Sequence, residues 1–335
     1  MVWLAGDGAA IAGEGTDHRD LSVFRYQPDR DQIAIADDVT GSLKELLPLS
    51  RLHRHHWESA EIWSELDALG LFGISLPESV GGSGLGAVEE ALIVIGLGQQ
   101  LAAPAVLATL GAAHVAPQPV GSRRIAAGYR NGGRILAVEE PMADLVLVRG
   151  EGEAALYRLP MLARPLDDSL WLAALHELAE PGEAVAEIGD DLALRLRMLD
   201  AAVLAGIAQA AVDMAVDYAG FREQFGRPIG SFQAVKHHCA NMILAARQAR
   251  DQTTFAAMAI DTGRPDAVLQ ADCAFVAAAS AALENAARNI QIHGGIGFSD
   301  EADPHLILKR ARLYLALAGG VETAHQRIAG YQPIW

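Results

Sequence analysis

Long helical patterns fill the second half of this sequence, and they limit the possible fold more than any other feature. From about Leu192, apolar residues recur at the spacing of buried α-helix faces in successive long runs. Short segments with glycine and proline, such as Gly263-Arg264-Pro265, separate the runs. Long helices with short connections pack side by side in antiparallel order. We therefore predict that residues 191–335 form a C-terminal four-helix bundle.

Three further segments precede the predicted bundle. Residues 1–28 are rich in glycine and aspartate and show no periodicity, which indicates an irregular leader. Residues 29–117 carry successive amphipathic helical patterns and are predicted to form an N-terminal helical domain. Between 118 and 190, short runs of β-forming residues alternate with turn signals such as Asn131-Gly132, which predicts a reduced middle β domain. The predicted fold class is mainly α with a small β domain.

The charge and the apolar segments exclude several classes of function. A net charge of −16 argues against nucleic-acid binding and against a polybasic membrane surface. The longest apolar stretch, 91–113, is interrupted by Gln99, Gln100 and Pro104, so we interpret it as buried helix and turn, not as a membrane span. The acidic residues near the N-terminus are unlike a signal peptide, and the expected location is therefore cytoplasmic.

Two local patterns suggest ligand sites but have simpler interpretations. The segment from Gly82 to Ala87 fits a dinucleotide-binding fingerprint, yet Pro77 interrupts the strand that should precede it. A loop between helices is the favoured interpretation. His53, His55 and His56 do not share one helix face, and no carboxylate or cysteine cluster completes a coordination set. We therefore predict no metal site.

The segment Arg222-Glu-Gln-Phe-Gly-Arg-Pro-Ile-Gly230, followed by Gln233, has the composition of an anion-binding turn. Arg222 carries a planar guanidinium that matches phosphate oxygens, and Phe225 can pack against an aromatic ring. Gln233 lies in the first turn of the next predicted helix, where free backbone N–H groups favour anions. The alternative is an arginine that caps a helix C-terminus beside a structural loop. On this segment alone, the two interpretations are equally supported.

The segment Gln291-Ile-His-Gly-Gly-Ile-Gly-Phe298 favours the ligand-binding interpretation. The adjacent Gly294 and Gly295 allow a backbone to approach a ligand closely, and the Gln291 side chain can donate to it or accept from it. Both segments, in this order and with one long helix pair between them, resemble the signature segments in the C-terminal half of acyl-CoA dehydrogenases. The resemblance covers residues 29–330.

The resemblance implies an FAD-dependent enzyme that dehydrogenates an acyl-CoA and passes electrons to a separate electron-transfer acceptor. In the family, the two segments reach across a subunit interface to the pyrophosphate and adenosine half of a neighbour's FAD. The FAD contacts that this implies in the present sequence are Arg222, Phe225, Gln233, Gln291, Gly294 and Gly295.

The sequence departs from the family at the catalytic base. Counting back from Arg327, the usual position of the carboxylate base falls on Gly320, and Glu322 is the nearby candidate. An alternative family position falls on Leu196. The next residue, Arg197, matches an arginine that contacts the adenosine part of CoA; its other interpretation is an exposed residue in the first turn of a long helix. The resemblance thus implies no catalytic residue in this chain.

A chain that keeps the donated FAD contacts, but lacks a base and a complete flavin cradle, resembles the short subunit of heteromeric (α2β2) acyl-CoA dehydrogenases of bacterial steroid degradation. This implies a longer acyl-CoA dehydrogenase-like partner that supplies the base, and a bulky, steroid-derived acyl-CoA substrate. Two alternatives stay open. One is a self-sufficient homo-oligomeric acyl-CoA dehydrogenase that uses Glu322, and the other is a scaffold subunit without enzymatic activity.

Overall fold

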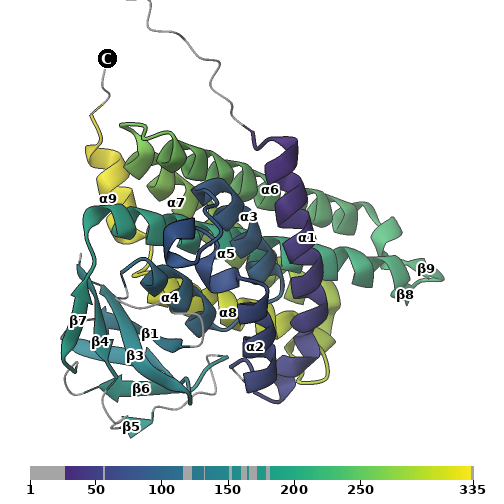
Figure 1. The fold of residues 1–335 in the computed structure, drawn as a ribbon. Helices are drawn as coiled ribbons and strands as arrows, with labels where there is room; N and C mark the ends of the chain where they lie inside the picture. The colour runs from purple at the N-terminus through teal and green to yellow at the C-terminus, as the bar shows by residue number, and fades with distance from the viewer. Residues whose placement is uncertain are drawn as a thin grey trace, which may run out of the picture.

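A computed structural model of the chain describes residues 27–55, 57–115, 123–131, 133–150, 153–159, 164–165, 172–178 and 182–332. Figure 1 shows a protein built mostly from helices, with a small sheet at one corner of the helical body. The predicted fold class is therefore confirmed. Nearly all of the predicted leader, together with Gly132 and His56, lies outside the described residues.

Local capping residues determine where the first helices begin. Asp29 accepts hydrogen bonds from the backbone at the start of α1, and the side chain of Gln32 completes a capping box. The apolar pattern predicts a helix over residues 57–69, but α2 begins later, because Ser59 accepts from the Ile62 N–H as its N-cap. The helices and short 3-10 turns of this part are α1 (Arg30–Leu46), η1 (Leu49–His53), α2 (Ala60–Ala68), η2 (Leu71–Gly73), η3 (Glu78–Val80), α3 (Ala87–Gln99) and α4 (Pro104–Ala113).

Helix α3 is buried along nearly its whole length, and a residue from the bundle caps its start. The carboxylate of Asp261 accepts hydrogen bonds from the backbone N–H groups of Ala87 (2.7 Å) and Val88 (3.1 Å). The glycine-rich segment 82–87 leads from the η3 turn into α3. This confirms that the segment connects helical elements, as predicted against the dinucleotide-binding fingerprint.

The sheet has the strand order β5-β6-β2-β1-β3-β4-β7, in which β1 and β3 run parallel and the other described pairs are antiparallel. Side chains alternate between its faces. Ala127, Leu145 and Leu147 join the main core beneath the helices, whereas Ala126 and Val146 pack in a small cluster on the other face. The strands are β1 (Arg124–Asn131), β2 (Arg134–Val138), β3 (Ala143–Gly150), β4 (Glu153–Arg158), β5 (Arg164–Pro165), β6 (Leu175–Leu178) and β7 (Ala184–Glu187).

The bundle surrounds α5, which packs against α3, α6, α7 and α8. Its elements are α5 (Asp190–Phe221), β8 (Glu223–Gln224), β9 (Arg227–Pro228), η4 (Ile229–Ser231), α6 (Gln233–Asp261), α7 (Ala267–His293), η5 (Gly294–Phe298), α8 (Pro304–Leu317) and α9 (Glu322–Gly330). Serine is a favoured N-cap residue, so the sequence predicts that Ser231 caps the helix that follows it, and this prediction is wrong. Phe232 is the N-cap residue, and the buried Ser231 hydroxyl has no hydrogen-bond partner among the described residues.

Two segments, Asp190–Phe221 and Ala267–Phe298, are long and apolar enough to cross a membrane by length and composition alone. In the fold they form the centre of the bundle, and 78% of the apolar window in the first and 50% in the second are buried inside the protein. Their apolar character is therefore explained by packing within the chain.

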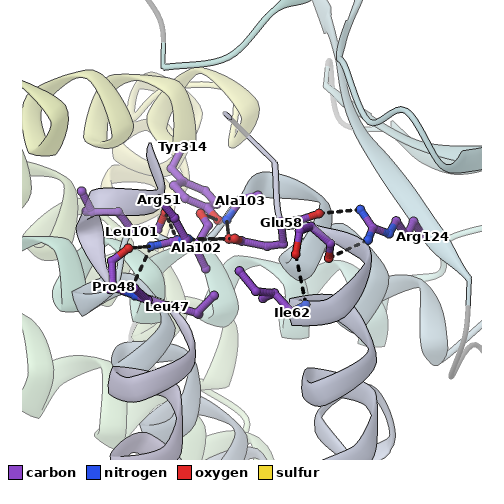
Figure 2. Close-up of polar contacts among 11 residues, drawn as sticks. Leu47, Pro48, Arg51, Glu58, Ile62, Leu101, Ala102, Ala103, Arg124 and Tyr314 are labelled. Atoms are coloured by element: carbon purple, nitrogen blue, oxygen red, sulfur yellow. Dashed lines mark hydrogen bonds and ion pairs between the residues drawn. The ribbon is translucent and has the colours of Figure 1, made fainter. Parts of the chain in front are cut away.

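A buried polar cluster around Glu58 joins the first helices to the sheet and to α8, and no local pattern in the sequence indicates it (Figure 2). The Glu58 carboxylate accepts from Arg51 Nε (2.8 Å) and Nη2 (3.1 Å) and from the Ala103 N–H (2.9 Å). Arg124 of β1 donates to the Glu58 carbonyl (2.7 Å) and to the Glu140 carboxylate (2.8 Å). Nearby, the Tyr314 hydroxyl of α8 donates to the Ala102 carbonyl at 2.9 Å.

Candidate functional site

The two predicted ligand-binding segments lie at the same end of the bundle. Arg222 follows the last residue of α5, and Gln291 lies in the last turn of α7. The rings of Tyr218 and His293 stack at 4.0 Å with 22° between their planes, so the C-terminal ends of α5 and α7 are in direct contact. Segments far apart in the sequence therefore lie next to each other at one end of the bundle.

The first of these segments is a projecting hairpin. Figure 1 shows β8 and β9 extending from the end of the helical body. The two residues between these strands, Phe225 (φ 53°) and Gly226 (φ 76°), are both left-handed, as a type I′ turn requires. This conformation is uncommon for a bulky residue. Phe225 is 91% exposed. It is therefore a solvent-exposed aromatic residue with a strained backbone conformation.

The second segment exposes its backbone. Gly294 adopts φ 67° and ψ −141°, and a Cβ at Gly294 or Gly295 would meet no atom within 4 Å. Space next to both glycines is therefore open on this chain. Gln291 is exposed, and within the described part of the chain neither Gln291 nor Arg222 uses its side chain in a hydrogen bond or ion pair. Both side chains are available to a ligand.

Gln233 occupies the first position of α6, beside the hairpin. Its amide lies 3.0 Å from His237 Nε2 one turn further along the helix. Arg227 stacks its guanidinium 4.2 Å above the Phe232 ring and adds a second cation to this end of the bundle. Arg222 and Arg227 thus supply two guanidinium groups at this end of the bundle, and guanidinium groups are suited to phosphate oxygens.

A small pocket lies between the sheet and the bundle, away from that end. Its volume is about 30 Å³, which holds about two water molecules, whereas pockets for cofactor-sized ligands are on the order of 300–1,000 Å³. The lining residues come from α4, β1, β3, α5 and α8: Pro104, Leu107, Ala108, Ala127, Gly128, Leu147, Arg149, Leu196, Leu199, Asp200, Tyr314 and Leu317. A three-ring flavin does not fit this space.

An ion pair lines the polar side of this pocket. Arg149 of β3 donates to both carboxylate oxygens of Asp200 on α5, at 2.8 and 2.5 Å. Burial lowers the pKa of Arg149, but the charge and hydrogen bonds of Asp200 outweigh burial, and the pKa is raised overall. Among the described residues that line the pocket, Asp200 is the sole carboxylate, and both of its oxygens are occupied.

Arg197 lies in the interior of α5 with a side chain that is 17% exposed. Its guanidinium stacks 4.5 Å from the Phe275 ring, donates to the Ala318 carbonyl at 3.3 Å and lies 3.7 Å from Asp272. The interpretation as an exposed residue in a first helical turn was wrong, because α5 begins at Asp190. Contact with the substrate CoA stays a prediction, and the observed partners of Arg197 all belong to its own chain.

The predicted base position is a glycine with a left-handed backbone. Gly320 has φ 71° and follows Gly319 at φ 83° in the turn between α8 and α9. A glutamate at this position would be strained, since side chains rarely adopt this region. Glu322 is the first residue of α9; its side chain is exposed and accepts from Gln326 at 3.3 Å. It does not line the pocket.

His53 of η1 contacts the start of α8. His53 Nε2 lies 2.7 Å from Asp303 at the surface. Across the described ranges, no group of three or more histidine, cysteine, aspartate or glutamate side chains is arranged to hold a metal ion.

Comparison with known proteins places these features in a family. Residues 29–121 match the N-terminal domain of acyl-CoA dehydrogenases, and residues 194–330 match the C-terminal domain. Acyl-CoA dehydrogenase IpdE2 of Mycobacterium tuberculosis is 33% identical over 264 residues, which cover 75% of this chain and 80% of that protein. The chain belongs to the acyl-CoA dehydrogenase family. Members of this family are FAD-dependent oxidoreductases acting on CH–CH groups.

Other relatives differ in length. Acyl-CoA dehydrogenase FadE34 of Mycobacterium tuberculosis is 33% identical over 286 residues, but the match covers 77% of this chain and 40% of that protein. The chain therefore spans less than half of FadE34.

Solved structures confirm the fold. A chain of the ChsE4–ChsE5 complex from Mycobacterium tuberculosis has a TM-score of 0.73 at 21% identity, covering 92% of this chain and 100% of that chain. The Tcur3481–Tcur3483 steroid acyl-CoA dehydrogenase, as a G363A variant, has a TM-score of 0.72 at 24% identity, covering 90% and 97%.

Proposed function

We propose that this chain is one subunit of a heteromeric acyl-CoA dehydrogenase that catalyses α,β-dehydrogenation of a bulky, steroid-derived acyl-CoA. In this proposal the chain donates FAD-binding residues across a subunit interface, while a longer acyl-CoA dehydrogenase-like partner supplies the catalytic base and the flavin cradle. FAD, when bound, supplies the acceptor for the hydride that leaves the acyl chain, and a separate electron-transfer acceptor reoxidises it.

The observation that carries the proposal is the separation of two regions within one chain. The side chains suited to a phosphate-containing ligand, Arg222 and Gln291, face outward at the end of the bundle. The pocket between the sheet and the bundle of the same chain is about 30 Å³ in volume and is lined on its polar side by the Arg149–Asp200 pair. A chain built in this way fits the dinucleotide half of an FAD that is held mainly by another subunit.

The candidate residues at this end of the bundle form what we call the outer site: Arg222, Phe225, Gln233, Gln291, Gly294 and Gly295. Their chemistry fits that part of FAD. Arg222 can donate two parallel N–H groups to phosphate oxygens, and Phe225 offers an exposed ring face to an aromatic group. Gly294 and Gly295 leave their backbone open to close approach. Gln233 and Gln291 add side-chain donors and acceptors around the same end of the bundle.

Two related structures support a partner subunit and a substrate class. ChsE4–ChsE5 is a complex, and Tcur3481–Tcur3483 is named as a steroid acyl-CoA dehydrogenase. Both are similar to this chain over nine-tenths of its length. From these names we infer that the substrate is a steroid-derived CoA thioester and that two different chains form each site.

The proposal is tested by flavin titration of the chain co-purified with a longer acyl-CoA dehydrogenase-like chain. Arg222→Ala is expected to weaken FAD binding by about one to two decades, because a charge-assisted hydrogen bond to phosphate is worth roughly 1.5–3 kcal/mol. Arg247→Ala, which removes an exposed arginine of α6, serves as the matched control and should change little. The isolated chain should purify without yellow colour. An Arg222→Ala complex with native flavin affinity would leave the scaffold alternative in place.

The self-sufficient alternative is tested at Glu322. Because this carboxylate is exposed at the start of α9 and lies outside the pocket, Glu322→Gln is expected to leave turnover of the complex within a few-fold of native. Loss of a general base would instead remove roughly 10²–10⁴ in rate. Turnover is compared at equal flavin content in both preparations. A hundredfold loss at full flavin occupancy would favour a chain that carries its own base.

A further inference from the structure

The interface between α5 and α7 is rich in alanine and therefore has few large side chains that interlock. Both helices bury alanines along most of their length. Small side chains let helices approach closely, but they interdigitate weakly and specify the axial position of one helix against the other poorly. A slip by one helical turn moves a residue by about 5.4 Å. Such a slip would separate Arg222 from Gln291, since each lies at the end of one of these helices.

Three polar residues of α7, spaced four apart, contact α5 along this interface. Asn285 donates to the Ala208 carbonyl at 3.3 Å and to the Met242 carbonyl of α6 at 2.9 Å. One turn further, Asn289 Nδ2 lies 3.3 Å from the Met214 sulfur. Asn285 and Asn289 are fully buried. Polar groups buried in an apolar helix interface favour the one register in which they find partners.

The third contact is the stack of His293 on Tyr218, and it lies directly beneath the outer site. His293 Nδ1 donates to the Asn289 carbonyl at 2.9 Å, which fixes the ring over the end of α7. The Tyr218 carbonyl accepts from the Arg222 N–H at 2.9 Å, and the Phe221 ring meets the Tyr218 ring edge-on at 5.3 Å. The stacked pair thus adjoins the backbone of Arg222 on one side and Gly294 on the other.

We propose that the Tyr218–His293 stack, together with Asn289, positions Arg222 and Gln291 so that both reach one FAD. These residues are positioning residues: they hold the ends of α5 and α7 in register and need not touch the cofactor. This inference rests on the proposed function, because it assumes that Arg222 and Gln291 bind the FAD of the assembled complex.

The test is FAD titration of the complex with its longer partner, using Tyr218→Leu, Tyr218→Phe, His293→Leu and the double variant Tyr218→Leu/His293→Leu. Loss of an aromatic stack should weaken FAD binding by about three- to tenfold. Tyr218→Phe keeps the ring and should bind FAD within about twofold of native. The double variant should bind FAD no more weakly than the single variant with the lower FAD affinity, because either change alone removes the same contact.

FAD titration of the Arg222→Ala complex in parallel distinguishes failure of the proposed function from failure of the positioning role. If Arg222→Ala binds FAD like the native complex, the proposed function fails. If Arg222→Ala weakens FAD binding but Tyr218→Leu and His293→Leu do not, the positioning role is overturned while the proposed function stands. Equal weakening by Tyr218→Phe and Tyr218→Leu would also overturn it, because the ring would then be irrelevant. Should Tyr218→Leu fail to fold, His293→Leu gives the same comparison at the end of α7.

Discussion

Replacing Glu58 with alanine is expected to lower the free energy of unfolding by about 3–5 kcal/mol, the range found when one partner of a buried ion pair is removed. The Glu58 side chain is 1% exposed and accepts two hydrogen bonds from Arg51 and one from the Ala103 backbone. Without it, the Arg51 guanidinium loses its counter-charge in a place that water reaches poorly, and the Ala103 N–H loses its acceptor.

A second buried cation makes this loss larger. Arg310 of α8 is fully buried, and its guanidinium nitrogens have no hydrogen-bond partner among the described residues. Burial lowers the pKa of Arg310 to about 10, so it remains charged at neutral pH, and the Glu58 carboxylate acts against this shift. The cluster therefore depends on Glu58 for more than one arginine.

Urea denaturation of Glu58→Ala beside Glu65→Ala measures the effect. Glu65 is an exposed glutamate of the neighbouring helix α2. Its replacement changes the net charge by the same amount as Glu58→Ala but leaves the cluster intact. We expect the midpoint for Glu65→Ala to stay close to native. A loss below about 1 kcal/mol for Glu58→Ala would mean that water replaces the carboxylate around Arg51, and the cluster would then contribute little to stability.

Local signals predicted the bundle well. The apolar patterns predict last helices over residues 303–317 and 321–330, and the structure has them at Pro304–Leu317 and Glu322–Gly330. The left-handed Gly319 and Gly320 end the first of these helices and allow the next to begin. Such signals reside in a few neighbouring residues. A local signal can also mislead. Serine is a favoured N-cap residue, yet the Ser231 hydroxyl caps no helix.

Contacts between distant residues could not be predicted in the same way. Glu58 meets Ala103 across 45 positions, and Arg149 meets Asp200 across 51 positions. Nothing in the sequence near either acid indicates its partner, since a lone glutamate or aspartate in a helical region is usually exposed. The convergence of Arg222 and Gln291 was expected from a family resemblance, whereas the Tyr218–His293 stack that joins their helices was not.

Breaking the Arg149–Asp200 pair gives the second large expected effect. Asp200→Leu should cost about 3–5 kcal/mol in unfolding free energy, because it leaves a buried guanidinium without its counter-ion. The double variant Arg149→Met/Asp200→Leu removes both charges and should recover most of that loss, since apolar side chains of similar size often replace a buried pair at little cost. Urea denaturation of the two single variants and the double variant measures the coupling.

The same double variant tests whether the pocket takes part in the reaction. If the pocket between the sheet and the bundle is closed packing and takes no part in the reaction, the complex carrying Arg149→Met/Asp200→Leu should keep native flavin content and turnover within a few-fold. Asp200 is the sole carboxylate among the described lining residues, so a pocket that acted on substrate would lose its one acid. A hundredfold loss of turnover at full flavin content would therefore place chemistry inside this chain. Retained turnover would leave the outer end of the bundle as its contribution to the shared site.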